Sequence, residues 1–394
     1  MTTTTYNPLK VIFVIDRMEL GGMELQVIEL LKGIDKLRFE CTLIMFRVGG
    51  GVSRKLYTIP GVRVICLFEH GKPNIIRIFH RLCLTLLRIE TDIVYSYLLG
   101  VNELCLLAGI ILNINVMWGV RVSNLDFSDF GFRYRIIFRM GACLSRFARK
   151  VIFNSEAGKA YHTLQGYSAS NMMVIPNGID TDGFGPDHRI AHNVRNGWMT
   201  DHTQYLIGLV GRIHPMKDHP TFLKAAALLL QKRKDVRFVC VGVGNDRYLA
   251  KLKELEQMLK ISDHLEWTGS RDDMTAVYNS LDILSLCSAY GEGFPNVVGE
   301  AMACGVPCVV TDVGDSARIV ENSGLVVAPG SPEALVEAWH TILELPDWQY
   351  KRMKKIAREK IVKEFSLQFM VQRTENTLLA AGFDQTPPKN IAML

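Results

Sequence analysis

The chain has 394 residues, of which 48% are hydrophobic and 22% are charged, and its formal net charge is +5. This composition is that of a folded globular protein of about two domains, and it excludes collagen-like, coiled-coil and low-complexity chains. Because the net charge is small and no nucleic-acid motif is recognisable, a nucleic-acid partner is not expected.

The N-terminal ten residues lack the basic-then-apolar pattern of a secretory signal, so we expect a cytoplasmic protein. Nine cysteines, an odd number without a Cys-x-x-Cys pair, favour reduced core thiols over disulfides or a metal site. The longest apolar stretch, residues 104–120, is interrupted by Asn113 and Asn115. This pattern predicts a helix end followed by a strand, and not a transmembrane helix.

The first half of the chain alternates between strand and helix patterns. This alternation is typical of a parallel α/β domain. The hydrophobic patterns predict strands at 11–16, 41–47, 62–67, 92–97, 115–120 and 150–154, and helices at 23–32, 75–89 and 131–150.

Basic charge is concentrated in this half, where residues 1–180 hold 21 Lys and Arg against 14 Asp and Glu. Residues 131–150 carry six basic residues and no acid, interleaved with aromatic and aliphatic residues. A helix of this kind can lie on an anionic membrane surface. Alternatively, its apolar face packs on its own domain and its arginines are solvated, and the sequence leaves both interpretations open.

Periodicity is lost over residues 182–203, and we predict an interdomain linker at 186–203. A second strand–helix series follows it. We expect two similar halves with a ligand-binding cleft between them. Strands are predicted at 204–212, 236–241, 265–268, 283–286 and 308–311, and helices at 220–232, 248–259, 274–279, from 296, from 332, from 348 and from 365.

Two glutamates lie on either side of the start of one predicted helix. Glu292 is in a Gly-Glu-Gly loop, and Glu300 falls about one turn inside the helix that begins near Asn296. The first-turn N–H groups between them favour phosphate, and a carboxylate just beyond can accept from two adjacent hydroxyls. The pattern suits a sugar nucleotide, although a surface loop before an ordinary helix would look the same.

Two other segments are suited to phosphate. Gly21 and Gly22 precede the first helix, where the backbone can approach a phosphate closely. Arg212 and Lys217 follow the first strand of the second series. Two cations there would suit a diphosphate leaving group, and the alternative is a pair of solvated charges in a loop.

Two further strand ends carry weaker signals. Gly242 and Gly244 form half of a dinucleotide fingerprint, but the third glycine is absent, so an NAD-linked dehydrogenase is disfavoured. Arg271 follows the strand predicted at 265–268 and could lie beside a base.

Taken together, these motifs resemble glycosyltransferase family 4 over about residues 10–371. The resemblance implies an α/β fold of the GT-B type, in which two Rossmann-like, doubly wound domains face a cleft. It implies an acceptor-side domain at 1–185, a nucleotide-sugar domain at 204–365, and a C-terminal helix and tail at 366–394 that cross back to the first domain.

The resemblance also implies an activity. Such an enzyme moves a sugar from a nucleotide diphosphate sugar, such as a UDP-sugar, with retention at the anomeric carbon. It needs no cofactor and no metal ion. The acceptor would be a glycan or a lipid-linked glycan, and the enzyme a hexosyltransferase or an N-acetylhexosaminyltransferase.

Residue by residue, the resemblance assigns Arg212 and Lys217 to the diphosphate and Glu292 to the donor sugar, and these three are the expected catalytic residues. Glu300 would bind the ribose hydroxyls. The expected donor-binding residues are Gly21, Gly22, Gly244, Arg271, Gly293, Phe294, Pro295, Asn296, Val297 and Glu300.

The chain departs from the family pattern at one place. Many relatives carry a histidine after the strand that ends near residue 118, and here Arg121 or Asn124 would replace it as a sugar or acceptor contact. The main hypothesis is a retaining glycosyltransferase of surface polysaccharide or glycolipid synthesis, peripheral at the inner face of the cell membrane. Because the histidine is missing, a non-catalytic nucleotide-sugar-binding subunit of a transferase complex is the alternative.

Overall fold

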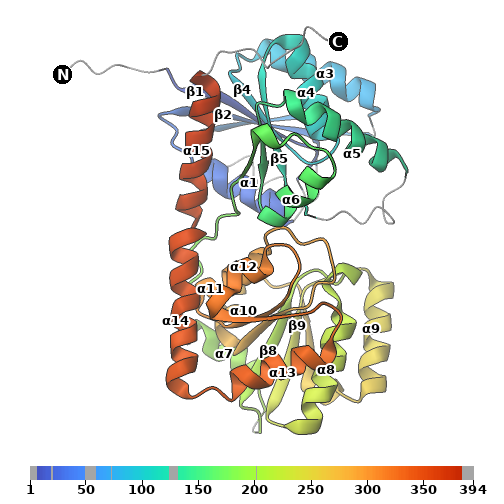
Figure 1. Cartoon of the computed structure of the whole chain (residues 1–394), viewed down its shortest axis with the longest axis vertical. Coiled ribbons are helices and arrows are strands. Elements are labelled where there is room, and N and C mark those ends of the chain that lie inside the picture. The colour runs from blue at the N-terminus through green and yellow to red at the C-terminus, as the bar shows by residue number, and fades with distance from the viewer. Residues whose placement is uncertain are drawn as a thin grey trace, which may run out of the picture. The chain divides into compact units, whose positions relative to one another are not determined.

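The computed structural model describes residues 7–18, 21–48, 59–71, 73–123, 132–200 and 202–383. Its contacts divide the chain into two compact units. One comprises the chain up to Gly178 together with the described residues from Leu367 on, and the other is Ile179–Ser366. Each unit is a parallel sheet covered by helices (Figure 1). The predicted doubly wound α/β architecture is confirmed for each unit.

The first unit has a seven-stranded sheet in the order β3-β2-β1-β4-β5-β6-β7. The strands are β1 (Leu9–Ile15), β2 (Phe39–Arg47), β3 (Val62–Phe68), β4 (Ile93–Tyr97), β5 (Asn115–Val120), β6 (Lys150–Phe153) and β7 (Met172–Val174). The helices are α1 (Gly22–Gly33), α3 (Ile75–Arg88), α4 (Val101–Leu112), α5 (Phe132–Leu144), α6 (Glu156–Leu164) and α15 (Leu367–Phe383).

Both faces of this first sheet are buried. On one face Phe13 of β1 packs in a core with residues of α1 and α15, and on the other face Val14 packs in a core with residues of α3, α4 and α5. A strand that is buried on both faces has a continuous run of apolar residues. For this reason the predicted strands in this half show little alternation of apolar and polar residues.

The second unit has a six-stranded sheet in the order β10-β9-β8-β11-β12-β13. The strands are β8 (Tyr205–Val210), β9 (Val236–Val241), β10 (Leu265–Gly269), β11 (Ile283–Leu286), β12 (Cys308–Thr311) and β13 (Gly324–Val327). The helices are α7 (His188–Trp198), α8 (His219–Lys232), α9 (Asp246–Leu259), α10 (Met274–Ser280), α11 (Asn296–Ala303), α12 (Ser316–Val320), α13 (Pro332–Leu343) and α14 (Asp347–Glu364).

The strand order reverses once in each sheet, between β1 and β4 in the first unit and between β8 and β11 in the second. On either side of such a switch point the crossover connections leave in opposite directions, so the loops at the carboxyl ends of the two central strands diverge. In open α/β sheets this is where ligands bind.

The predicted linker at 186–203 is wrong, because this stretch contains α7. The Asp187 carboxylate caps the helix by accepting from the Arg189 N–H at 2.9 Å. Trp198 is buried in the core of the second unit. The apolar positions of α7 that are buried or packed against the core, Ala191, Val194 and Trp198, recur at spacings of three and four residues, but the polar residues between them conceal this periodicity. The boundary between the units therefore lies at Gly178, ahead of the predicted residue 185.

The apolar stretch 104–120 divides as predicted. Helix α4 ends at Leu112, Asn113 follows in the left-handed conformation with φ 56°, and β5 begins at Asn115. No helix in the described part of the chain is long and apolar enough to cross a membrane.

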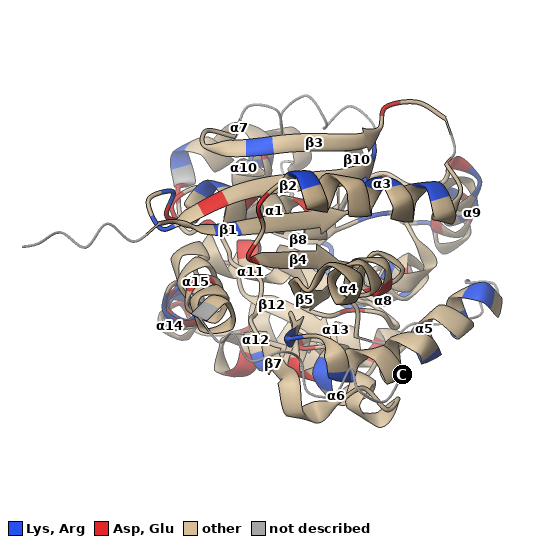
Figure 2. Cartoon of the chain, turned by 90° about the horizontal axis from the view of Figure 1, so that it is seen from above, with Lys and Arg blue, Asp and Glu red and all other residues tan. Residues whose placement is uncertain are grey.

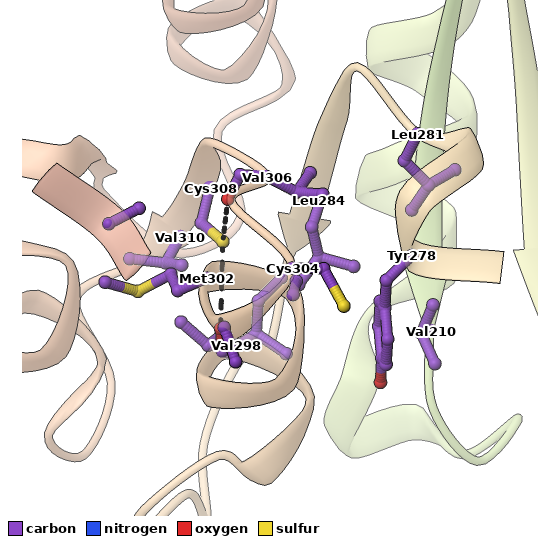
Figure 3. Close-up of a cluster of buried hydrophobic side chains, with 14 of the residues drawn as sticks. Val210, Tyr278, Leu281, Leu284, Val298, Met302, Cys304, Val306, Cys308 and Val310 are labelled. Carbon is purple, nitrogen blue, oxygen red and sulfur yellow. Dashed lines mark hydrogen bonds between the residues drawn. The ribbon is translucent and has the colours of Figure 1, made fainter. Parts of the chain in front are cut away.

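The nine cysteines are free thiols, as predicted, although Cys143 is exposed and so is not a core thiol. The others are buried or half-buried. The Cys308 thiol, for example, lies 3.5 Å from the Val306 carbonyl oxygen in the core under α11 (Figure 3). Burial raises the pKa of this thiol well above its ordinary value.

Candidate functional site

The candidate site of the second unit lies at the switch point between β8 and β11. The loop after β8 carries Arg212 and Lys217, and the loop after β11 carries Glu292. The two loops are joined by their backbones, because the Ala289 N–H donates to the Met216 carbonyl at 2.8 Å. Charged residues that are distant in sequence are thereby held at the edge where open α/β sheets bind ligands.

Lys217 and Glu292 form a buried ion pair. The Lys217 Nζ lies 2.5 Å from the Glu292 Oε1, and the side chains are only 12% and 8% exposed. The Ser288 hydroxyl donates to the same carboxylate oxygen at 2.5 Å. Burying two charges costs free energy unless further hydrogen bonds offset it. Ser288, which is fully buried, supplies one such bond.

The loop that carries Glu292 is fixed from the opposite side by the segment after β12. The Asp315 N–H donates to the Gly293 carbonyl at 2.9 Å. Gly314 has φ +63°, and a Cβ there would lie 2.4 Å from the Glu292 carbonyl oxygen. Both the backbone conformation and the space therefore require glycine. Sequence reasoning missed Gly314, although a glycine just after a buried strand was the available signal.

Glu300 lies inside α11, as predicted, and is hydrogen-bonded to a buried tyrosine. The Tyr278 hydroxyl of α10 donates to the Glu300 Oε2 at 2.6 Å. Burial raises the pKa of Glu300, and the bond from Tyr278 acts in the opposite direction. Tyr278 itself packs in the core with Val210 and Leu281 (Figure 3). The N-cap of α11, Pro295, provides no side-chain cap.

The glycines after β8 and β9 are explained by close backbone contact. A Cβ on Gly242 would lie 1.9 Å from the Gly211 carbonyl oxygen, and a Cβ on Gly244 would lie 2.0 Å from that of Ile213. The Ile213 N–H also donates to the Val243 carbonyl at 2.9 Å. The partial dinucleotide fingerprint thus has a packing reason, and a donor contact by Gly244 stays a prediction.

The other predicted residues of this unit differ in how accessible they are. Arg212 is exposed. Arg271 is bound to Asp273, with its Nε 2.8 Å from Oδ1, and its guanidinium lies over the Trp198 ring at 5.3 Å. The Phe294 side chain is 5% exposed and belongs to the core, so a donor could meet this residue only through its backbone. Gly293 and Pro295 are buried, and Asn296 and Val297 are half-buried.

In the first unit, Gly21 is the N-cap of α1 and Gly22 its first residue. Gln26 of the same helix bonds both the N–H and the carbonyl of Gly178, each at 2.8 Å. Arg121 follows β5, and Asn124 lies outside the described residues. Within the described ranges, no group of three or more His, Cys, Asp and Glu side chains could hold a metal ion.

Two family models match the chain. Residues 20–183 match the model described as Glycosyltransferase Family 4. Residues 192–360 match the model described as Glycosyl transferases group 1.

Among curated proteins, the chain is similar to the D-inositol 3-phosphate glycosyltransferase of Mycolicibacterium smegmatis, with 31% identity over 245 residues, 59% of this chain and 52% of the relative. It is also similar to the putative glycosyltransferase EpsF of Bacillus subtilis, with 27% identity over 157 residues, 40% of either chain. The aligned part thus spans about half or less of these relatives.

Among solved structures, the Anabaena protein Alr3699/HepE in complex with UDP-glucose is similar over 94% of this chain and 100% of its own, with a TM-score of 0.81 and 22% identity. The lipopolysaccharide outer core galactosyltransferase WaaB in its apo form is similar over 95% of this chain and 99% of its own, with a TM-score of 0.70 and 16% identity. At these identities the likeness shows a shared fold.

The buried ion pair generates a stability prediction. Lys217→Met leaves the Glu292 carboxylate without its lysine, so the free energy of unfolding should fall by roughly 3 kcal/mol in urea titrations. Adding Glu292→Gln should recover part of this loss. Lys251→Met, a matched change at an exposed lysine of α9, should cost under about 0.5 kcal/mol. An equal effect of Lys217→Met and Lys251→Met would contradict the prediction.

Proposed function

Because this chain belongs to glycosyltransferase family 4, we propose that it transfers a sugar from a nucleotide diphosphate sugar to a glycan or lipid-linked acceptor, with retention at the anomeric carbon. The observation that carries the proposal is the gathering of Lys217, Glu292 and Ser288 at the switch point of the second sheet. Glu300 is bonded to Tyr278 and lies inside α11, the helix that follows the loop of Glu292.

In the proposed mechanism, Arg212 and Lys217 bind the diphosphate. The leaving nucleoside diphosphate gains negative charge in the transition state, so fixed cations stabilise the transition state more than the ground state. The buried Lys217 suits this role because Glu292 fixes its position, and the Ser288 hydroxyl in turn holds the Glu292 carboxylate. Preorganised charges need no rearrangement during the reaction.

Glu292 and Glu300 would then have different tasks, with Glu300 accepting from the ribose hydroxyls and Glu292 contacting the donor sugar. Neither is proposed as one of a pair of hydrolytic carboxylates, since such pairs flank the anomeric carbon. We propose instead that the departing phosphate helps to deprotonate the acceptor on the same face of the sugar, which gives retention.

We propose a UDP-sugar as donor, because the similar HepE structure holds UDP-glucose. For the acceptor, we propose a surface polysaccharide or glycolipid, because WaaB acts on the lipopolysaccharide outer core. The transferred sugar is a hexose or an N-acetylhexosamine. A phosphorylated inositol, which the name of the Mycolicibacterium smegmatis relative contains, is a further candidate acceptor.

The first experiment is calorimetric titration of the full chain with UDP and a panel of UDP-sugars, followed by assays of transfer to lipid extracts. Lys217→Ala should lower kcat by about 100-fold or more while the donor still binds. Glu300→Ala should abolish donor binding. Lys224→Ala, at an exposed lysine of α8, is the matched control and should change neither quantity.

Two outcomes would contradict this proposal. If neither UDP nor any UDP-sugar bound, the assignment of the site itself would be wrong. If the wild type bound the donor but neither hydrolysed nor transferred it with any extract, the chain would instead be the non-catalytic subunit of a complex. Arg121, at the place where many relatives carry a histidine, motivates that alternative.

A second prediction concerns pH. Only the carboxylate form of Glu300 can accept from both ribose hydroxyls, so donor affinity should fall as the pH drops through the raised pKa of Glu300. Tyr278→Phe removes the bond that lowers this pKa, so the midpoint of the affinity profile should move to higher pH. Above that midpoint, the loss of affinity should stay within about tenfold, the effect of one hydrogen bond.

Tyr350→Phe is the matched control, because it removes another phenol donor of the same unit, the half-buried hydroxyl that donates to the Asp282 carbonyl at 2.9 Å. Its pH profile should coincide with that of the wild type. If Tyr278→Phe also left the midpoint in place, the proposed contact of Glu300 with the donor would be wrong.

The first unit also carries a surface suited to an anionic membrane. Helices α3, α4 and α5 contact one another in that order. They hold ten of the twenty exposed large hydrophobic residues of the described chain, and their one acid, Glu103, is buried. Figure 2 shows basic residues on α3 and α5. The ten apolar residues are Ile75, Ile76, Leu84, Leu87, Leu107, Ile111, Phe132, Tyr134, Ile136 and Met140.

This distribution favours the interpretation of α5 as a membrane-binding helix over that of a solvated helix, because α5 buries only Phe138, Gly141 and Ala142 and exposes four large apolar side chains. These are Phe132, Tyr134, Ile136 and Met140. Exposed apolar groups interleaved with arginines match an interfacial helix, which inserts its apolar side chains and binds anionic headgroups. We therefore propose peripheral attachment through α3, α4 and α5 at the inner face of the cell membrane.

We expect the full chain to sediment with phosphatidylglycerol vesicles, and we expect the bound fraction to fall as the salt concentration rises. Arg135→Glu with Arg139→Glu should reduce the bound fraction at low salt by about tenfold or more. Lys251→Glu with Lys253→Glu, the same charge change on exposed lysines of α9, should reduce it far less. Equal effects of the two pairs would count against the surface.

A further inference from the structure

Arg121 is a half-buried cation in the first unit that no acid neutralises among the described residues. Its guanidinium donates to the Asn177 Oδ1 at 3.1 Å and lies over the Tyr97 ring, 5.1 Å from its centroid. These are neutral partners, and no Asp or Glu of the described chain forms an ion pair with Arg121. Removing a cation from water without placing an anion beside it costs free energy.

The surroundings of this cation are buried and polar, but they hold no anion. The Tyr97 hydroxyl has no exposed surface and interacts with the Tyr95 hydroxyl and with Arg121. Burial raises the pKa of both phenols above the ordinary value, so neither supplies a negative charge. The Arg121 Nε has no hydrogen-bond partner among the described residues. Because a buried donor without an acceptor costs free energy, the guanidinium is suited to an anion that the protein does not itself supply.

The surroundings hold these two side chains in place. Tyr97 ends β4 and Arg121 follows β5, so both lie at the carboxyl edge of the first sheet, next to the switch point. A Cβ on Gly119 would lie 2.6 Å from a carbon of the Tyr97 ring, so the ring packs directly on the β5 backbone. The bonds from Gln26 to Gly178 fix the segment that carries Asn177.

We infer that Arg121, held in place by Tyr97 and Asn177, is the subsite for an anionic group, a carboxylate or a phosphate. A guanidinium presents parallel N–H donors that match the two oxygens of such a group. This inference rests on the proposed function, and the group belongs either to the transferred sugar or to the acceptor. The enzyme would thus act on an acidic or phosphorylated carbohydrate.

Calorimetry on the full chain tests this in two arms. In the donor arm, UDP-glucuronate is compared with UDP-glucose, which differs only in having a hydroxymethyl group in place of the carboxylate. In the acceptor arm, glucose 6-phosphate is compared with glucose at saturating UDP. The wild type should bind the anionic member at least about tenfold more tightly in one arm, and the arm that responds identifies the source of the group.

Arg121→Gln should remove that preference and leave the affinity for UDP unchanged. Arg38→Gln is the matched control, since Arg38 also lies over an aromatic ring, that of Phe39, but is paired with Glu375. If Arg121→Gln lowers the melting temperature, Arg121→Lys is the second variant. It keeps the charge but lacks the parallel N–H donors of the guanidinium, so it should lose part of the preference.

A wild type without preference in either arm would overturn the inference, and so would an Arg121→Gln variant that weakened neutral and anionic ligands equally. These results are distinct from a failure of the proposed function. In that case UDP itself would not bind, whereas here UDP binds normally and only the anionic preference is missing.

Discussion

The ion pair between Lys217 and Glu292 joins the two halves of the second sheet where its strand order reverses. The two residues are 75 positions apart, and they meet because β8 and β11 are neighbours in the sheet. Two buried charges persist together only when their geometry and their further hydrogen bonds offset desolvation. Ser288 provides such a bond, and Gly314 leaves room for the Glu292 backbone. The protein's own groups therefore fix the positions of Lys217 and Glu292, as electrostatic preorganisation requires.

Much of the remaining architecture supports this arrangement through close backbone contact. At Gly242 and Gly244 a side chain would collide with the carbonyl oxygens of the loop after β8. These glycines keep the loops after β8 and β9 in contact, and so position Arg212 and Lys217. A glycine pattern that suggests a dinucleotide fingerprint can thus arise from packing alone, and the physical distinction is whether the glycines face a ligand or another backbone.

The two units share the order of six strands, to which the first unit adds β7, but the residues at their switch points differ in chemistry. The second unit pairs its buried lysine with a carboxylate, whereas the partners of Arg121 among the described residues of the first unit are neutral, namely an amide and two tyrosines. A cation that is paired with a carboxylate of the same protein needs no anion from a ligand. A half-buried cation without such balance indicates a ligand, and this difference gives the first unit a recognition role of its own in the proposed transfer.

The sequence by itself determined most of the elements and the residues proposed for the main site, because strand and helix periodicity, Gly-Glu-Gly before α11 and the Arg212–Lys217 segment are local patterns. It did not reveal the short elements α6, β7, α12 and β13, nor α7, whose polar residues conceal its apolar stripe. It also did not show that the ring of Phe294 belongs to the core. Tertiary structure alone decided that Tyr278 bonds Glu300, that Ser288 and Lys217 share one oxygen of Glu292, and that Arg121 lies over Tyr97. The physical reason is that strand order, which no local pattern encodes, determines which distant residues meet.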